Sequence, residues 1–344
     1  MSESIPARVS LDQLVGWIRA VLESEGVPYR IARVEADVMA EADLHGVPSH
    51  GVRMLPSLIR ALRLGQATRN PNLRVLRDHA AVILLDCDNG PGRYTSARAM
   101  GHAVARAREH GIGFCLAVRT THWGRAHAYA LRAARNGMVG LCATNAIPNM
   151  TAWGSARPLL GNNPLAIGVP QGDAPIVLDM AMSQAAVGKV GTWLREGLRV
   201  PQGWGLDREG RPTDDPAKIL ESCMLLPCGG HKGAGLALMI ELLTAGLSGC
   251  PLSLEIVETD RSGLDAGSTK LFLAIDPECL GEPGTLARRS GDLAAWLRAR
   301  AGVSIKLPGD RGREARRRNL EEGIPIHPAI ASALTSLRPC PPWM

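Results

Sequence analysis

Two histidine-containing turns are the parts of this 344-residue chain best suited to proton transfer. Ser49, His50 and Gly51 follow a helical pattern that ends near Gly46, and His122 lies in the turn Thr120–Gly124, directly after an apolar run. An imidazole titrates near neutral pH, so it can both donate and accept a proton. The structural alternative for either ring is a helix cap or a hydrogen-bonded core residue. For His122 the functional role is favoured slightly more, because strand ends in α/β sheets often face a ligand crevice.

Asp179 is a carboxylate at the end of the apolar run 176–182. Such a group is costly to bury unless it is solvated or paired. Pairing with an imidazole would raise the pKa of that histidine, whereas the structural alternative is a helix N-cap. A second polar stretch, Gly161–Pro164, precedes another apolar run and contains Asn163.

A glycine-rich segment, Gly229–Gly235, opens a long apolar helical pattern over 232–247 and contains His231 and Lys232. Glycines at a helix start let a ligand approach the backbone, and the free N–H groups and the helix dipole favour an anion there. Lys232 adds a positive charge. The same glycines would also suit a tightly packed turn with a solvated lysine, so the residues alone leave both interpretations open.

Several function classes lack their sequence signals. The chain has no G-x-G-x-x-G, Walker A or G-x-S-x-G motif, and its histidine pairs five residues apart lack the carboxylates or cysteines of a zinc site, so no metal is expected. The eight cysteines include no C-x-x-C pair and suggest free thiols in a reducing cytoplasm. A net charge of +6 and 3% aromatic residues argue against nucleic-acid binding. No apolar run is long enough for a membrane helix, and no signal peptide is apparent.

The order of patterns predicts two kinds of structure. Helical spacing at 11–22, 31–44 and 56–64 makes the N-terminal region helical, with a capping box from Ser10 and Gln13. The middle alternates helical patterns with apolar runs that predict strands at 80–86, 112–118, 139–145, 165–170, 176–182, 223–227 and 271–276. Helices return after Pro283, with one short strand at 304–307. We therefore expect an α/β (α+β) protein, with a mixed-sheet domain at 76–280 and a discontinuous helical domain formed by 1–75 and 281–344.

Several blocks occur in one order over nearly the whole chain. They are ADLHGVPSHGV (42–52), HWG (122–124), WGSARPLLGNNPLA (153–166), LDMAMS (178–183), PQGWGLD (201–207), GGHKGAGLAL (229–238), LFLAIDPE (271–278) and NLEEGIP (319–325). In these blocks the chain resembles the malate/L-lactate dehydrogenase family of nicotinamide-dependent oxidoreductases that lack a Rossmann fold. Members of that family include ureidoglycolate, sulfolactate and diketogulonate enzymes and reductases of cyclic imino acids such as piperideine-2-carboxylate.

The resemblance implies a hydride transfer between NAD or NADP and the C=O or C=N carbon of a 2-oxo acid, its 2-hydroxy acid or a cyclic imino acid. It implies that His50 faces the nicotinamide as the acid/base group, although in some members the histidine matching His122 has that role. Asp179 would orient a histidine or form a wall of the nicotinamide pocket. The protein is expected to act on a small molecule, as a cytoplasmic homodimer.

The same resemblance assigns residues to the two ligands. For the substrate they are Ser49, Arg53, Met54, Asn163 and Pro164. For the cofactor they are His122, Asn145, Asn163, Asp179, Met180, Ala181, Met182, Ser183, His231, Lys232, Gly233, Gly309, Asp310 and Arg311. The arginines of 311–318 would suit either a solvated helix face or a 2′-phosphate, so NAD and NADP remain alternatives.

One departure from the family pattern concerns the substrate. Many members carry an arginine four residues after the histidine of the S-H-G turn, where this chain has Met54, with Arg53 one position earlier. On a helix, one position rotates a side chain by about 100°. This shift argues against simple malate or lactate and favours an imino acid or a larger 2-oxo acid, unless Arg53 or Arg157 holds the carboxylate. The competing function is a non-catalytic member that serves as a scaffold, which titration with NADH or NADPH would distinguish.

Overall fold

A computed structural model describes residues 7–259 and 263–343 of the chain. Its centre is a seven-stranded sheet in the order β2-β3-β4-β12-β5-β8-β9. The strands are β2 (Arg74–His79), β3 (Val82–Gly90), β4 (Ile112–Thr120), β5 (Val139–Thr144), β8 (Leu165–Val169), β9 (Ile176–Met180) and β12 (Ser268–Ile275). Only β3 and β4 pair in parallel, joined through the 19-residue helix α4 (Gly92–His110), and the other neighbours are antiparallel. The sheet is therefore mixed, which confirms the predicted fold class.

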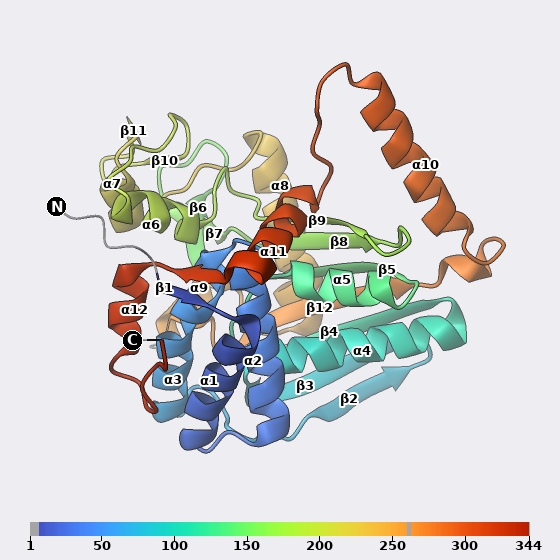
Figure 1. Ribbon diagram of the computed structural model, residues 1–344, viewed down its shortest axis with the longest axis horizontal. Helices are drawn as coiled ribbons and strands as arrows, with labels where there is room; N and C mark the ends of the chain where they lie inside the picture. The colour runs from blue at the N-terminus through green and yellow to red at the C-terminus, as the bar shows by residue number, and fades with distance from the viewer. Residues whose placement is uncertain (1–6, 260–262, 344) are drawn as a thin grey trace.

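Two apolar clusters cover the two faces of this sheet. Adjacent residues of β5, Cys142 and Ala143, belong to different clusters, because successive side chains of a strand point to opposite faces. On one face pack α4 and α5 (His127–Arg135), as Figure 1 shows. On the other face packs α8 (His231–Glu241), through residues that include Ala237 and Ile240.

The two ends of the chain share a third cluster. It contains residues of α1 (Leu11–Ser24), α2 (Tyr29–Leu44), α3 (Leu55–Arg63) and α12 (Pro328–Leu334). A two-stranded ladder of β1 (Ala7–Val9) with β13 (Ile324–Ile326) ties the ends together. Tyr94 and Leu264, from the middle of the chain, also belong to this cluster, so the predicted domain boundaries stay a prediction. The capping box predicted for α1 is present, with reciprocal bonds between Ser10 and Gln13.

Smaller elements complete the described structure. They are the short helical turns at Pro48–His50, Val52–Met54 and Pro277–Cys279, strands β6 (Pro148–Thr151), β7 (Pro158–Gly161), β10 (Gly205–Leu206) and β11 (Pro212–Thr213), helices α6 (Val187–Arg195), α7 (Pro216–Ser222), α9 (Ser253–Thr259), α10 (Thr285–Arg300) and α11 (Asp310–Glu322), and a π-helical turn at Leu242–Gly246. Helix α10 projects away from the rest of the fold (Figure 1). No helix in the described ranges is long and apolar enough to cross a membrane.

Two predicted strands are absent. The run 223–227 makes only single bridges, between Leu225 and Met150 or Gly205 and between Pro227 and Ser183. Its apolar residues are buried as an irregular segment, and Pro227 has no N–H for a ladder. The segment 304–307 has no partner strand among the described residues, and the N–H of Leu307 donates instead to the side chain of Asp310 at the start of α11, at 2.8 Å.

Candidate active site

The two histidine turns predicted from the sequence meet in space. The rings of His50 and His122 are stacked, with centroids 5.8 Å apart and an interplanar angle of 28°. His50 comes from the turn between α2 and α3, on the helical cluster, and His122 follows β4 of the central sheet. Both rings are half-buried. The site therefore lies where the helical ends of the chain contact the sheet.

A buried carboxyl group fixes the His50 turn. Asp43, near the end of α2, accepts a hydrogen bond from the N–H of Val52 at 2.7 Å. A Cβ atom on Gly51 would lie 2.0 Å from an oxygen of Asp43, which explains why glycine follows the histidine. Burial raises the pKa of Asp43 to about 7. The sequence signal for this contact is the D-L-H-G-V-P-S-H-G spacing, but the contact itself was not predicted.

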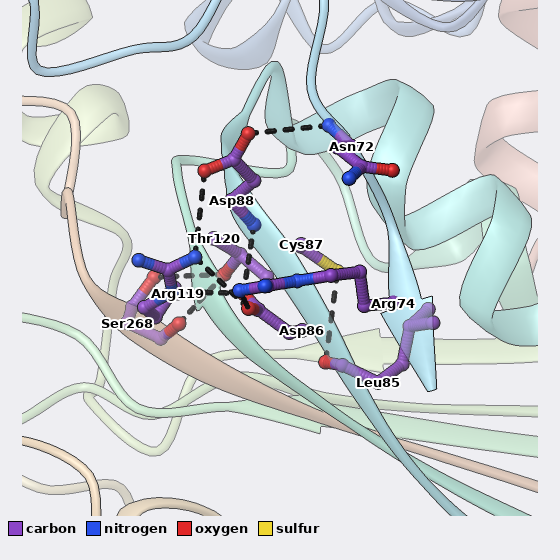
Figure 2. A network of polar contacts seen from close by, with 9 residues as sticks. All are labelled: Asn72, Arg74, Leu85, Asp86, Cys87, Asp88, Arg119, Thr120 and Ser268. Atoms are coloured by element: carbon purple, nitrogen blue, oxygen red, sulfur yellow. Dashed lines mark hydrogen bonds and ion pairs between the residues drawn. The ribbon is translucent and has the colours of Figure 1, made fainter. Parts of the chain in front are cut away.

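An ion network fixes the end of the strand that carries His122. Figure 2 shows Asp86 on β3 accepting hydrogen bonds from Arg119 at 2.8 and 2.9 Å and from Arg74 at 2.8 Å. These arginines hold the pKa of Asp86 down to about 2, against the effect of its burial. Two residues after the end of β4, the N–H of His122 donates to the carbonyl of Leu264 at 2.6 Å. The register of β3 and β4 therefore sets the position of the imidazole.

Arg93 connects the two histidine turns. It is almost fully buried in an ion pair with Glu35 of α2, 3.3 Å from nitrogen to oxygen, and its other Nη donates to the carbonyl of His50 at 3.4 Å. On the second turn, a Cβ atom on Gly124 would lie 2.7 Å from Nε of Arg93. Neither Arg93 nor Glu35 was predicted, because no local pattern reveals that residues 58 positions apart form a pair.

The carboxylate of Asp179 pairs with neither His50 nor His122. Its carboxylate accepts from Nε of Arg125 at 2.9 Å and from the N–H of His127 at 3.3 Å, so its partners are a guanidinium and a helix start rather than either predicted catalytic imidazole. The pKa of His50 is lowered to about 4, first by burial and then by Arg125, Arg93 and Arg53. The pKa of His122 is lowered well below its usual value by burial and its charged neighbours. Pairing of Asp179 with either imidazole, one of the two alternatives that the sequence left open, is therefore not found, and both histidine pKa values are lowered instead.

Lys270 is a further charged group beside this site that the sequence did not reveal. It lies on β12, is 1% exposed, and donates through Nζ to the hydroxyl oxygens of Thr120 and, at 2.8 Å, of Ser268. The same Nζ is 5.9 Å from the ring centroid of Trp123. Burial lowers the pKa of Lys270 to about 7. Its charge is one of the causes that lower the pKa of His122.

The predicted substrate residues divide into two groups. Ser49 bonds the ring of His50, Oγ to Nδ1 at 2.8 Å, and Arg53 lies over the same turn with Nη1 3.5 Å from the carbonyl of Ser49. Met54 packs against the helical cluster instead. The reason is that Val52–Met54 form a 3-10 turn, so the helical rotation assumed from the sequence does not apply. The structure therefore gives no support to a substrate contact by Met54.

The two predicted asparagines use their side chains inside the protein. Asn163 donates to the carbonyl of Ala237 and to the carboxylate of Glu241, both at 2.9 Å, and accepts from the N–H of Ala146 at 3.0 Å. Asn145 accepts from the N–H of Thr269 at 2.9 Å. With these atoms occupied, Asn145 and Asn163 position the backbone around them. Pro164 follows Asn163 directly and is half-buried.

The predicted cofactor segments lie next to one another. The N–H of Cys228 donates to the carbonyl of Met182 at 2.8 Å, which joins Met180–Ser183 to the glycine-rich start of α8. His231 and Lys232 are exposed there, and Gly230, the N-cap, supplies no capping side chain. Gly233 is buried, and a Cβ on it would lie 2.5 Å from the carbonyl oxygen of Cys228. Packing therefore requires that glycine, while the side chain of Lys232 is exposed to solvent.

The third predicted cofactor segment, Gly309–Arg311, begins α11 and contacts the edge strand β9. The N–H of Val177 donates to the carbonyl of Pro308 at 3.4 Å. Asp310 pairs with Arg298 at 3.1 Å and with Arg313. A cavity of about 350 Å³ adjoins it, lined by Arg298, Val303, Ser304, Ile305, Lys306, Asp310 and Glu314. Arg311 is exposed.

The stacked imidazoles, with several arginines near them, thus lie where the mixed sheet meets the helices of both chain ends. A family model for malate/L-lactate dehydrogenase matches residues 9–335. The malate dehydrogenase of Pyrococcus horikoshii is 33% identical over 96% of this chain and 94% of its own length. The (2R)-3-sulfolactate dehydrogenase (NADP⁺) of Chromohalobacter salexigens is 36% identical over 95% of this chain and 96% of its own.

A solved structure gives the same result. The Δ1-piperideine-2-carboxylate reductase of Pseudomonas syringae superposes with a TM-score of 0.87 at 32% identity and covers 96% of this chain and 99% of its own. The chain belongs to the malate/L-lactate dehydrogenase family. This membership confirms the predicted enzyme class, an NAD(P)-dependent oxidoreductase, and the sulfolactate and piperideine-2-carboxylate enzymes are among the relatives expected from the sequence.

Proposed function

We propose that this protein transfers a hydride between NAD(P) and the C2 carbon of a 2-oxo or 2-hydroxy acid, or the C=N carbon of a cyclic imino acid, with His50 as the acid/base group. The observation that carries this proposal is the stacked pair of His50 and His122, half-buried and surrounded by arginines. Burial and nearby arginines lower the pKa of His50 to about 4, so its ring is neutral at pH 7 and becomes an effective base for a hydroxy acid when a bound anion raises that pKa. In the reverse direction, a bound anionic substrate raises that pKa and helps the ring to carry the proton.

The hydrogen bonds of the two rings favour His50 over His122. Nδ1 of His122 accepts from the N–H of Gly124 at 3.1 Å. A backbone N–H can only donate, so the neutral ring of His122 carries its proton on Nε2 and presents a donor there. Such a ring suits polarisation of a substrate oxygen. His50 instead bonds the hydroxyl of Ser49, which can donate or accept and therefore follows either protonation state.

The residues present fit a dinucleotide. The exposed Lys232 and the uncapped start of α8 suit a phosphate. The segment Met180–Ser183 connects this helix start to Asp179. Asp179 pairs with Arg125, and the charge of Arg125 lowers the pKa of His50. Bound NAD(P) supplies the hydride chemistry. The choice between NAD and NADP falls to the cations near Asp310, among them Arg298 and Lys306 around the adjoining cavity.

The test compares His50→Ala with His122→Ala. We expect His50→Ala to lower kcat by about 10²–10⁴-fold, the usual contribution of a general acid or base, with the NADH or NADPH dissociation constant unchanged. Both quantities are measured on the same sample, with 2-oxo acids and cyclic imines as substrates. A His50→Ala enzyme within about threefold of wild type would transfer the role to His122. Cofactor binding without turnover of any substrate in the panel would favour the non-catalytic alternative.

We further propose a homodimer formed through α8 and the turn that follows it. Leucines and a methionine of this segment are about half-exposed, namely Leu236, Leu238, Met239, Leu242, Leu243 and Leu247. Contiguous apolar surface of this kind is rare on monomers, and a second copy covers it by two-fold symmetry. Light scattering at micromolar concentration tests this. A monomer with full activity contradicts it.

A further inference from the structure

Helix α6 brings a second arginine to the His50 turn. Gly188, Gly191, Thr192 and Arg195 are spaced three or four positions apart, so they lie on one face of the helix. A Cβ on Gly188 would lie 2.5 Å from Cβ of Ser49 and 3.2 Å from Nη1 of Arg53. The backbone of α6 therefore packs directly on the turn that carries His50. This contact places Arg195, two turns later on the same face, near Arg53.

Among the residues that the structure describes, no carboxylate balances the charges of these two arginines. Two other arginines near the histidines form ion pairs: Arg93 pairs with Glu35, and Arg125 pairs with Asp179. Within residues 7–259 and 263–343, neither Arg53 nor Arg195 has a carboxylate in ion-pair distance. Burial and the charge of Arg195 lower the pKa of Arg53. Two partly buried cations side by side repel each other unless an anion lies between or beside them.

The donors of Arg195 are also incompletely used. Its Nη2 donates to the hydroxyl of Thr192 at 2.9 Å, which holds the guanidinium over the helix face. Its Nε is buried and has no hydrogen-bond partner. A buried unpaired donor is costly, so this atom is suited to a ligand oxygen. Arg53 is among the charges that lower the pKa of both His50 and His122, and it lies on the same turn as His50. Arg53 is therefore the nearer of the two to the reacting atoms.

We propose that Arg53 and Arg195 together bind a substrate with two anionic groups, in which Arg53 holds the carboxylate next to the reacting carbon and Arg195 holds a second carboxylate or a sulfonate. The inference rests on the proposed function, because it locates the reacting carbon at His50. It selects a dianionic 2-oxo or 2-hydroxy acid over a cyclic imino acid, whose ring carries one carboxylate. In this arrangement the carboxylate contact comes from Arg53, which lies against α6, and not from residue 54.

The experiment measures binding first, so that it does not depend on turnover. Protein saturated with NADH or NADPH is titrated calorimetrically with malate and 3-sulfolactate, and with lactate and 2-hydroxybutyrate as monoanions. These compounds do not react with the reduced cofactor. We expect wild type to bind at least one dianion at least tenfold more tightly than either monoanion, and Arg195→Leu to remove about 10–100-fold of dianion affinity, as expected for a lost charge-assisted pair. Monoanion affinity should change less than threefold.

Two further variants control the result. Arg195→Lys keeps the charge and should retain part of the dianion preference. Arg199→Leu removes an exposed arginine that pairs with Asp214 at 3.2 Å, and it should leave all affinities unchanged. Equal affinities for dianions and monoanions in wild type, or a preference that survives Arg195→Leu, would overturn the proposal. Turnover of oxaloacetate, sulfopyruvate, pyruvate and a cyclic imine is then measured. If dianions bind more tightly but no substrate is turned over, the proposal of a two-arginine site is supported and the proposed function is refuted. If substrates are turned over without a preference for dianions, the proposed function is supported and the two-arginine site is refuted.

Discussion

Gly51→Ala tests how the His50 turn is held. The added methyl group would overlap the carboxyl group of Asp43, 2.0 Å from its nearer oxygen, so one of the two must move. Movement of Asp43 breaks its bond to the N–H of Val52 and leaves a buried donor unpaired, which costs about 1–3 kcal/mol. Overpacking in a filled site costs a further 1–3 kcal/mol or so. We expect the free energy of unfolding to fall by about 2–6 kcal/mol.

The same change should also affect catalysis. A displacement of His50 by about 1 Å is enough to lower turnover by roughly 100-fold, while the segments predicted to bind the cofactor are untouched. The assay is denaturant unfolding together with kcat and the cofactor dissociation constant. Gly101→Ala is the matched control, because its Cβ would meet nothing within 4 Å on α4 and should stabilise the protein by about 0.5–1 kcal/mol. If the free energy of unfolding of Gly51→Ala lay within about 0.5 kcal/mol of the wild-type value and turnover were unchanged, Asp43 would not hold the His50 turn as described.

Three other outcomes are expected. Lys232→Ala should weaken NAD(P) binding with little effect on the kcat of the saturated enzyme, and unchanged cofactor affinity would exclude a phosphate contact. Asp43→Asn should flatten the dependence of stability on pH: the folded carboxyl keeps its proton up to about pH 7, whereas an unfolded aspartate loses it near 3.8, so wild-type stability falls as the pH rises through that window. Unfolding curves at pH 5 and 7 should show about 2 kcal/mol less loss for the variant, and parallel losses would contradict the buried, protonated state. Met54→Arg should lower stability by about 1–3 kcal/mol, because it puts a charge against the helical cluster, and a tenfold gain in kcat/KM for oxaloacetate would show instead that residue 54 faces the substrate.

Local patterns predicted the elements that carry their own signal. Six of the seven apolar runs in the middle of the chain became strands of the central sheet, because strands buried on both faces read as continuous apolar segments. The edge strand β2 was missed, since all six of its residues are exposed and nothing in the sequence marks it as buried. The short ladder of β1 with β13 was missed because a three-residue strand depends on a distant partner.

The site divided in the same way. His50 and His122 stood out because polar residues interrupted apolar patterns and matched a family, and the structure brings their rings together. Glu35, Arg93 and Lys270 lie within helices and a strand, where a charged residue in the sequence resembles any solvent-facing one. Their burial depends on partners from other elements, and one sequence does not contain that information. The ion pair of Asp179 with Arg125 was not predicted for the same reason, because Arg125 is 54 positions away.

The closure of the helical cluster by both chain ends affects how the enzyme is made. Val52 and Leu55, close to His50 in the sequence, share their cluster with Ile324, Leu334 and Leu337, so the turn that carries His50 cannot pack fully until these residues leave the ribosome. At about 5–20 residues per second, nearly 300 residues separate these events by roughly 15–60 s. During that interval the sheet can form, while the apolar residues of α1–α3 lack the contacts that 324–337 supply. A product that stops before residue 324 is therefore expected to form the sheet but to leave the His50 turn incompletely packed.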